Sequence, residues 1–313
     1  MNKPFKELRI VFMGTPEFAV ASLDALVQAG ANIVGVVTAP DKPAGRGMKL
    51  TESAVKKYAA ERGLTLLQPE KLRDPQFLDA LRNLEADLQI VVAFRMLPEL
   101  VWDMPPMGTV NLHGSLLPQY RGAAPINWAV INGEAYTGVT TFQLQHAIDT
   151  GNILLQEKFA IGENDTAGDV HDTMKAIGAD LLVRTVQELA AGTLKPVEQL
   201  SLAEGTELKH APKLFTETAK IDWALPVDQV YDLIRGLAPY PAAFTELQDK
   251  TLKIFQARKE HDDEMSLHPG AVLTDHKTFL KFAAADGYIH VLELQLEGKK
   301  RMMVDDFLRG FRF

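Results

Sequence analysis

Two polar side chains stand two residues apart in a short apolar run, 109–113, whose sequence is TVNLH. In a β-strand, residues i and i+2 point to the same face, so Asn111 and His113 share a face and Leu112 points the other way. Gly114 ends the run and places both polar groups near the carboxyl end of the predicted strand, where ligands bind in open α/β sheets. The plainer alternative is two polar residues that only satisfy a turn.

A third polar group, Asp149, follows in the sequence HAIDTGN between two further predicted strands. The alternative to a functional carboxylate here is an Asx-turn aspartate next to a glycine. If the three side chains meet, Asn111 can donate a hydrogen bond to a developing oxyanion. His113 can move a proton near neutral pH, and Asp149 can orient His113 or help take the proton of an amine. This set predicts direct attack of an outside amine on an acyl carbonyl.

Other kinds of chemistry are excluded or disfavoured. The chain has no cysteine, so disulfides, thiolate metal sites and a cysteine nucleophile are impossible. It contains no G-x-S-x-G elbow and no G-K-[S/T] phosphate loop, and the first predicted strand is followed by GTPEF instead of G-x-G-x-x-G. A nicotinamide or P-loop enzyme is therefore disfavoured. The histidines lack a ligand spacing such as H-E-x-x-H, so we expect no metal.

The elements that would position these residues alternate between β-branched apolar runs and helical patterns. That alternation is typical of a parallel sheet covered on both faces, so we predict a doubly wound α/β domain with a mostly parallel sheet. Strands are expected at residues 8–13, 32–38, 64–67, 87–94, 109–113, 137–143 and 153–161, and helices at 16–30, 51–62, 74–84 and 166–191.

The pattern weakens after residue 192, where prolines and glycines interrupt it, and this indicates a linker. A helix is expected at 227–237, and short, closely spaced strands are expected at 243–247, 251–257, 271–274, 278–283 and 288–294. Such spacing favours a small β-barrel, with the OB-like type as a candidate. We therefore predict a catalytic domain at 1–192, a linker at 193–211 and a smaller C-terminal β-barrel domain at 212–313.

The central segment NLHGSLLPQYRGAAP, followed by DTG, resembles the folate-dependent formyltransferases. The segments FMGTPEFA, APDKPAGRG, APKL, IDW and LELQLEGKKRM resemble the branch of this family that acts on an aminoacylated tRNA. The resemblance runs from Leu8 to Gly310. It implies a Rossmann-like formyltransferase domain, 10-formyltetrahydrofolate as the formyl donor, and the α-amine of methionyl-initiator tRNA as the acceptor in translation initiation.

The resemblance also implies roles for single residues of this chain. The catalytic positions correspond to Asn111, His113 and Asp149. Folate contacts are implied for a loop, Ser115, Leu116, Leu117 and Pro118, and for the segment beside the pteridine pocket, Phe94, Arg95, Met96 and Leu97. Contacts with tRNA are implied for Lys42, Arg46 and Lys49, and a position near the methionyl group for Phe18. Arg95 departs from the pattern, since the family usually has glycine there.

The net charge of −8, from 33 Lys and Arg against 41 Asp and Glu, argues against a broadly basic nucleic-acid-binding face. Residues 209–313 hold 15 basic and 16 acidic residues, a net of −1, so the excess of negative charge lies in residues 1–208. A tRNA contact must then use local clusters, which are Lys42, Arg46 and Lys49 in one loop and Lys299, Lys300 and Arg301 near the C-terminus. Binding through such clusters should be modest and strongly weakened by salt.

No signal peptide and no run of about 20 apolar residues is recognisable, so we expect a cytoplasmic protein, and we expect a monomer. Two alternatives stay open. The first is a related formyltransferase that acts on a small amine, such as an aminosugar nucleotide or glycinamide ribonucleotide. The second is a folate- or RNA-binding protein without catalysis. The basic loop and the second domain favour tRNA over a small amine, and the complete Asn111, His113 and Asp149 set favours an enzyme.

Overall fold

The computed structural model describes residues 3–44, 49–203, 205, 207–262, 264 and 266–312. The chain divides into two compact units. The first unit consists of Met1–Arg121, Gly138–Lys158 and Thr173–Lys209, and the second consists of Gly122–Thr137, Phe159–Asp172 and His210–Phe313. Within the described residues, no helix is both long enough and apolar enough to cross a membrane.

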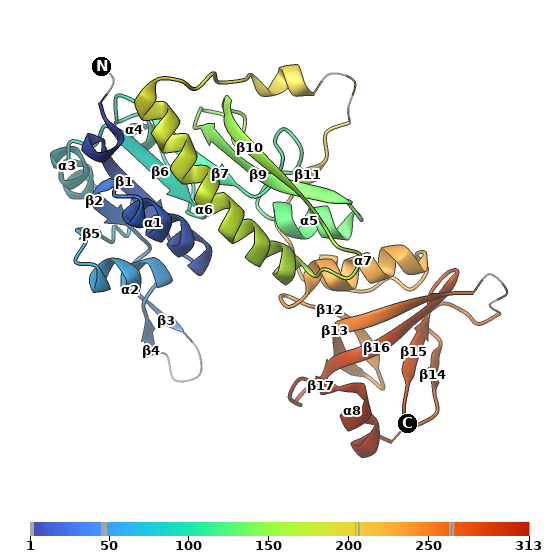
Figure 1. The fold of residues 1–313 in the computed structure, drawn as a ribbon. Coiled ribbons are helices and arrows are strands. Elements are labelled where there is room, and N and C mark those ends of the chain that lie inside the picture. Colours follow the sequence, from blue (N-terminus) through green and yellow to red (C-terminus); the bar gives the residue numbers. More distant parts are fainter. Residues whose placement is uncertain are drawn as a thin grey trace. The chain divides into compact units, whose positions relative to one another are not determined.

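The first unit is built on a seven-stranded sheet with the order β10-β9-β7-β6-β1-β2-β5 (Figure 1). Neighbouring strands run parallel from β7 to β5, whereas β9 runs antiparallel to β7. The predicted doubly wound, mostly parallel sheet is therefore confirmed. Its strands are β1 (Arg9–Gly14), β2 (Asn32–Val37), β5 (Leu66–Leu67), β6 (Leu88–Val92), β7 (Thr109–His113), β9 (Tyr136–Gln143) and β10 (Ile153–Ala160).

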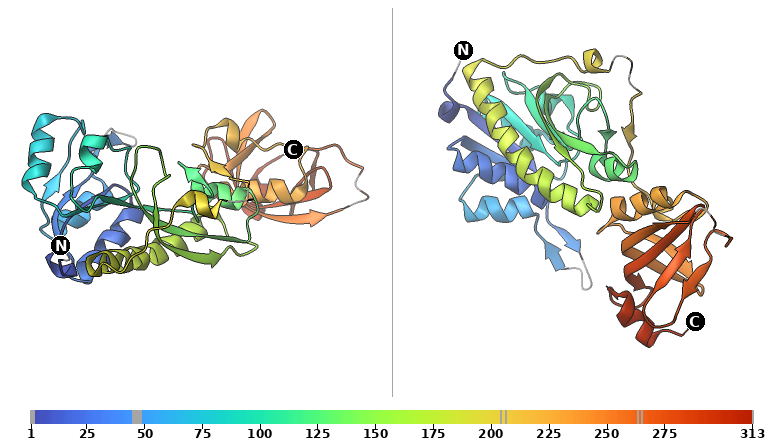
Figure 2. Two further views of the ribbon diagram at one scale, coloured as in Figure 1. Left: turned by 90° about the horizontal axis from the view of Figure 1, so that it is seen from above. Right: turned by 45° about the vertical axis from the view of Figure 1, so that its right-hand side comes forward.

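Helices cover both faces of this sheet (Figure 2). On one face lie α1 (Glu17–Gln28) and α6 (Ala167–Ala191), and on the other lie α3 (Pro75–Asn83) and α4 (Glu99–Trp102). Phe77 of α3 and Val101 of α4 pack in one buried cluster with Val11 and Met13 of β1. The remaining elements of this unit are η1 (Phe5–Glu7), the hairpin β3 (Lys42–Ala44) and β4 (Lys49–Thr51), α2 (Ala54–Glu61) and η2 (Gln199–Leu202). Two further short strands are β8 (Arg121–Gly122) and β11 (His210–Ala211), of which β11 belongs to the second unit.

Helix α6 lies very close to β7 because it carries a glycine at the point of contact. A Cβ atom added to Gly178 would be 3.0 Å from Leu112 of β7. A hydrogen bond of 2.8 Å between the hydroxyls of Thr141 and Thr185 also joins β9 to this helix. Since Leu112 faces α6, its neighbours Asn111 and His113 face the other side of the sheet.

The second unit contains an antiparallel sheet with the order β12-β13-β16-β15-β14, and β17 pairs with β16. This half-barrel confirms the predicted small barrel domain. Its elements are α5 (Pro125–Ile131), η3 (Glu217–Ala219), α7 (Val227–Leu237), β12 (Ala243–Leu247), β13 (Lys250–His261), β14 (Val272–Thr274), β15 (Leu280–Ala283), β16 (Gly287–Leu296), β17 (Met302–Met303) and α8 (Val304–Gly310).

The start of α2 and the content of the expected linker add detail to the sequence-based expectations. The helix expected at 51–62 begins at Ala54, because the Ser53 hydroxyl accepts a hydrogen bond from the Lys56 amide at 3.0 Å and so caps the helix. Thr51 belongs to β4 instead. The segment expected to be a linker, 193–211, contains the short helix η2, and Gln199 in it is only 1% exposed.

The core of the second unit offers a test of stability. Phe282 is 1% exposed, and its ring stacks on Trp223 at a centroid distance of 4.7 Å. We expect Phe282→Ala to lower the free energy of unfolding by about 3–5 kcal/mol, because it removes buried apolar surface and leaves a cavity. The exposed Val272 pairs with Phe282 across the sheet, and Val272→Ala should cost less than about 1 kcal/mol. Equal losses in chemical denaturation would contradict this placement of the core.

Candidate active site

The candidate site begins at the carboxyl end of β7. Asn111 is half-buried and pairs with Val91 of β6 and Phe142 of β9. His113, two residues later on the same face, is 7% exposed. Asn111 thus lies on a backbone that is paired on both sides, and His113 pairs with Thr140 of β9, so the sheet restricts the movement of both residues.

The surroundings of His113 determine which of its ring nitrogens can exchange a proton. Nε2 lies 2.9 Å from the backbone carbonyl oxygen of Tyr120. A carbonyl oxygen only accepts hydrogen bonds, so Nε2 carries the hydrogen. Nδ1 is then the proton-accepting nitrogen of the neutral ring, and it lies 3.9 Å from Oδ2 of Asp149. The structure thus brings Asp149 beside the His113 ring, too far for a direct hydrogen bond but close enough to stabilise a positive charge on it.

Asp149 lies in a tight loop between β9 and β10. Its φ angle is 54°, in the left-handed region that non-glycine residues rarely adopt. The neighbouring Gly151 has no room for a side chain, since a Cβ atom there would be 1.6 Å from the carbonyl oxygen of Gln143. Under this loop, the Gln199 side chain donates hydrogen bonds to the carbonyl oxygens of Asp149 and Gly151 at 2.9 and 2.7 Å.

The loop after β7 holds the residues that the family resemblance associates with folate. Ser115 and Leu117 are buried, and Leu116 is half-buried. The Thr140 hydroxyl donates to the carbonyl oxygen of Ser115 at 2.6 Å and accepts from the amide of Leu117 at 3.1 Å. The loop that includes Pro118 is therefore fixed against β9, and its side chains offer little exposed surface.

A hollow of about 450 Å³ lies where β1 and β6 end. It is lined by Phe94 and Arg95, two of the predicted folate contacts, and by Lys42, a predicted tRNA contact, together with Thr15, Ala39, Pro40, Asp41 and Glu70. In the sheet, Val92 of β6 pairs with Gly14 of β1 and with Leu112 of β7. The hollow and the Asn111 and His113 pair therefore belong to the same edge of the sheet.

Two of the charged side chains in the wall of this hollow, Arg95 and Asp41, are bonded to neighbours. The Arg95 guanidinium donates to the backbone carbonyl oxygens of Pro69 and Glu70, the latter at 2.8 Å. Partial burial lowers the pKa of Arg95. Asp41 accepts hydrogen bonds from Lys56 at 2.5 Å and from Gln68 at 2.9 Å, and these bonds hold its pKa below the usual value. Arg95, which the sequence analysis singles out, is thus bonded to the loop after β5.

The other predicted contacts occupy varied environments. Phe18 is buried, with 9% of its surface exposed, at the start of α1. Met96 is 74% exposed, and Leu97 packs at the edge of the cluster beneath α3 and α4. Lys49 belongs to β4, although its side chain lies outside the described residues, as does the whole of Arg46. Within the described ranges, no group of three or more His, Asp and Glu side chains is arranged to hold a metal ion.

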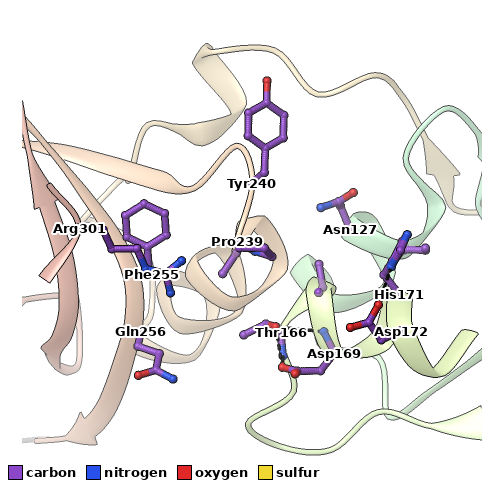
Figure 3. Close-up of a pocket in the computed structure, with 14 residues that line it drawn as sticks. Asn127, Thr166, Asp169, His171, Asp172, Pro239, Tyr240, Phe255, Gln256 and Arg301 are labelled. Carbon is purple, nitrogen blue, oxygen red and sulfur yellow. Dashed lines mark hydrogen bonds and ion pairs between the residues drawn. The ribbon is translucent and has the colours of Figure 1, made fainter. Parts of the chain in front are cut away.

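A second hollow, of about 700 Å³, lies inside the second unit (Figure 3). Tyr240, with 82% of its surface exposed, projects from its rim, and Asp169 and Thr166 form part of its floor. Arg301, from the predicted C-terminal basic cluster, lies over the Phe255 ring at 4.2 Å and is paired with Glu293. None of the residues predicted for catalysis or folate binding lines this hollow.

Sequence reasoning missed Gln199 as a residue of the site. It lies in a stretch without helical or strand periodicity, and its residue type suggests no reaction. Its contacts with the Asp149 loop join parts of the chain that are 50 and 48 residues apart. Spacing within one sequence contains no signal for such a contact.

Comparisons with known proteins agree with this architecture. A formyl transferase family model matches residues 8–186, and the model of the formyl transferase C-terminal domain matches residues 213–312. The methionyl-tRNA formyltransferase of Bacteroides thetaiotaomicron is 55% identical over 312 residues, covering 98% of this chain and 97% of that relative. The methionyl-tRNA formyltransferase of Phocaeicola vulgatus is 57% identical over 315 residues, with the same coverage.

Two solved structures share the fold. The first is the N-formyltransferase of Helicobacter canadensis in complex with folinic acid and dTDP-3-aminofucose. It aligns with a TM-score of 0.66 at 19% identity, over 91% of this chain and 98% of that one. The second is HypX of Aquifex aeolicus in complex with tetrahydrofolic acid, which aligns with a TM-score of 0.65 at 18% identity, over 97% of this chain and 48% of that one. On the full-length identity and both family models, the chain belongs to the formyltransferase family, among the methionyl-tRNA formyltransferases.

Proposed function

We propose that this protein transfers a formyl group from 10-formyltetrahydrofolate to the α-amine of methionyl-initiator tRNA by direct acyl transfer, for translation initiation. The observation that carries the proposal is the cluster at the end of β7, where Nδ1 of the buried His113 faces Asp149 at 3.9 Å and Asn111 lies on the same strand face. The relatives that share 55% of its residues over nearly their whole length are named for this activity, which supports the choice of acceptor.

In the proposed reaction, the amine nitrogen bonds to the formyl carbon, and the bond between that carbon and the folate nitrogen breaks. Asn111 would donate a hydrogen bond to the formyl oxygen as negative charge develops there. His113 would accept the amine proton at Nδ1, because its Nε2 hydrogen is held by the Tyr120 carbonyl oxygen. Asp149 would stabilise the resulting imidazolium, and the proton can then pass to the departing folate nitrogen.

The donor is proposed to bind at the same sheet edge, in the hollow lined by Phe94 and Arg95. Its wall offers an aromatic ring and the apolar surfaces of Ala39 and Pro40 beside polar groups, which suits a flat heterocycle. Folate, when bound, supplies the activated formyl group. We further propose that the loop at Ser115, Leu116, Leu117 and Pro118 helps to shape this pocket, together with Met96 and Leu97, which follow Arg95 in the chain.

The acceptor is proposed to bind through local positive charge. Lys42 is exposed in the β3–β4 hairpin, and we assign Arg46, Lys49 and the C-terminal Lys299, Lys300 and Arg301 to the same task. Phe18 would lie near the methionyl group. We also propose a catalytic domain at 1–192, a linker at 193–211 and a tRNA-contacting domain at 212–313, which the limits of the two family models support. A tRNA acceptor implies a cytoplasmic enzyme.

The choice of acceptor is tested with purified protein and formyl-folate. The acceptors offered are charged initiator tRNA, uncharged initiator tRNA and, separately, the small amines. We expect formyl transfer to charged initiator tRNA and none to the uncharged tRNA. Transfer to an aminosugar nucleotide or to glycinamide ribonucleotide, with none to charged tRNA, would overturn the proposed function in favour of a small-amine enzyme.

We expect His113→Ala to lower kcat by about 10²-fold or more, because the amine loses its proton acceptor. The dissociation constant for folate should change by less than about 2-fold, since the hollow does not include this residue. The measurements are steady-state formyl transfer and folate binding by calorimetry.

His268→Ala is the matched control, because this histidine is exposed in the second unit. The kcat of this variant should equal that of the wild type. An unchanged kcat in His113→Ala would assign His113 a structural role only.

We expect Lys42→Ala to weaken tRNA binding and to make it less sensitive to salt. Each lost phosphate contact reduces the slope of log K against log salt by about 0.7–0.9. The experiment is filter binding of charged tRNA over a series of KCl concentrations, with Arg46→Ala measured in parallel. Lys57→Ala, an exposed lysine on α2, is the control and should leave the slope unchanged. Equal slopes for all the variants would refute the hairpin as a phosphate contact.

A further inference from the structure

The segment between the regions matched by the two family models reaches the candidate active site through one buried side chain. Gln199 of η2 is 1% exposed, and its Nε2 donates to the carbonyl oxygens of Asp149 and Gly151 at 2.9 and 2.7 Å. The segment is attached nearby, because Val197 and Ile153 exchange two backbone hydrogen bonds of 2.8 Å.

The oxygen of the Gln199 amide is also hydrogen-bonded. Its Oε1 accepts hydrogen bonds from Nε and Nη2 of Arg121 at 3.0 and 2.6 Å. Arg121 directly follows Tyr120, whose carbonyl oxygen binds the His113 ring. One buried amide therefore links the loop that carries Asp149 to the segment that orients His113.

The loop at Asp149 needs such support for two reasons. The left-handed φ of 54° at Asp149 is unfavourable for a residue with a side chain, so it persists only where the surroundings impose it. In addition, buried carbonyl oxygens require hydrogen-bond donors. Gln199 supplies donors to the carbonyl oxygens of both Asp149 and Gly151.

We propose that Gln199 is a positioning residue for formyl transfer: through the backbone of Asp149 and Gly151 it holds the Asp149 carboxylate against Nδ1 of His113. The catalytic role in this inference rests on the proposed function. The inference also assigns a role in the active site to the segment between the two family-matched regions.

Two substitutions separate the contacts of Gln199. Gln199→Glu keeps the shape of the side chain and its acceptors for Arg121, but it turns the donor toward Asp149 and Gly151 into an oxygen. Gln199→Leu removes both sets of contacts. We expect each to lower kcat by about 10–100-fold, because a small displacement of a catalytic group has effects of this size. The KM values for folate and for tRNA should stay within about 2-fold. Leu200→Ala, at a neighbouring residue that is 64% exposed, should behave as the wild type.

A double-mutant cycle distinguishes positioning from general stability. In an Asp149→Asn background, Gln199→Leu should lower kcat by less than about 2-fold further, since the group it positions is already lost. A further loss of the full 10–100-fold would overturn the proposal and assign Gln199 to the fold alone. An unchanged kcat in both single variants would overturn it as well.

Hydrogen exchange of the amides in residues 147–153 gives a readout that needs no catalysis. We expect faster exchange there in Gln199→Glu than in the wild type or in Leu200→Ala, and unchanged exchange in that loop would refute the positioning role. If the wild type formylates no charged tRNA, the proposed function fails, while the exchange result still decides whether Gln199 holds the loop.

Discussion

The alternation of side chains along β7 decides on which face of the sheet the candidate active site lies. Leu112 is buried against α6, which approaches closely because Gly178 has no side chain. Asn111 and His113 must then face the opposite side, and a shift of the strand by one residue would bury them against the helix. The pairing of Asn111 with Val91 and Phe142 on the two neighbouring strands fixes that register. The candidate site is thus a consequence of how the sheet is packed.

The fold follows from the sequence where hydrophobic periodicity is strong. The bounds of α7 and β12 agree with the prediction, and the strands of the parallel sheet agree to within a few residues. The hairpin β3–β4 was missed because its sequence is short, polar and rich in proline and glycine, which weakens any strand signal. The sequence predicts no helix at α5, although Pro125 stands at its first position, because seven residues are too few for a clear helical periodicity.

The sequence predicts the reactive residues of the candidate site but not the residues that hold them in place. Residues such as His113 and Asp149 can be picked out because their side chains have the chemistry for catalysis, and the family resemblance supplied their pairing. The groups that hold them in place are ordinary amides and hydroxyls. Gln156, for example, donates at 2.8 Å to both the Leu117 carbonyl oxygen and the Thr140 hydroxyl. Such contacts join distant segments, so one sequence without its fold does not reveal them.

Direct acyl transfer makes these supporting groups important. Without a covalent intermediate, the rate must come from orientation and from charges placed where the reaction needs them. In the proposed mechanism, His113 can offer Nδ1 to the amine because the Tyr120 carbonyl oxygen holds the hydrogen on Nε2. Asp149 lies beside Nδ1 only while its loop keeps a strained backbone. A site of this kind should therefore lose rate through small displacements of its backbone, even when every reactive side chain is still present.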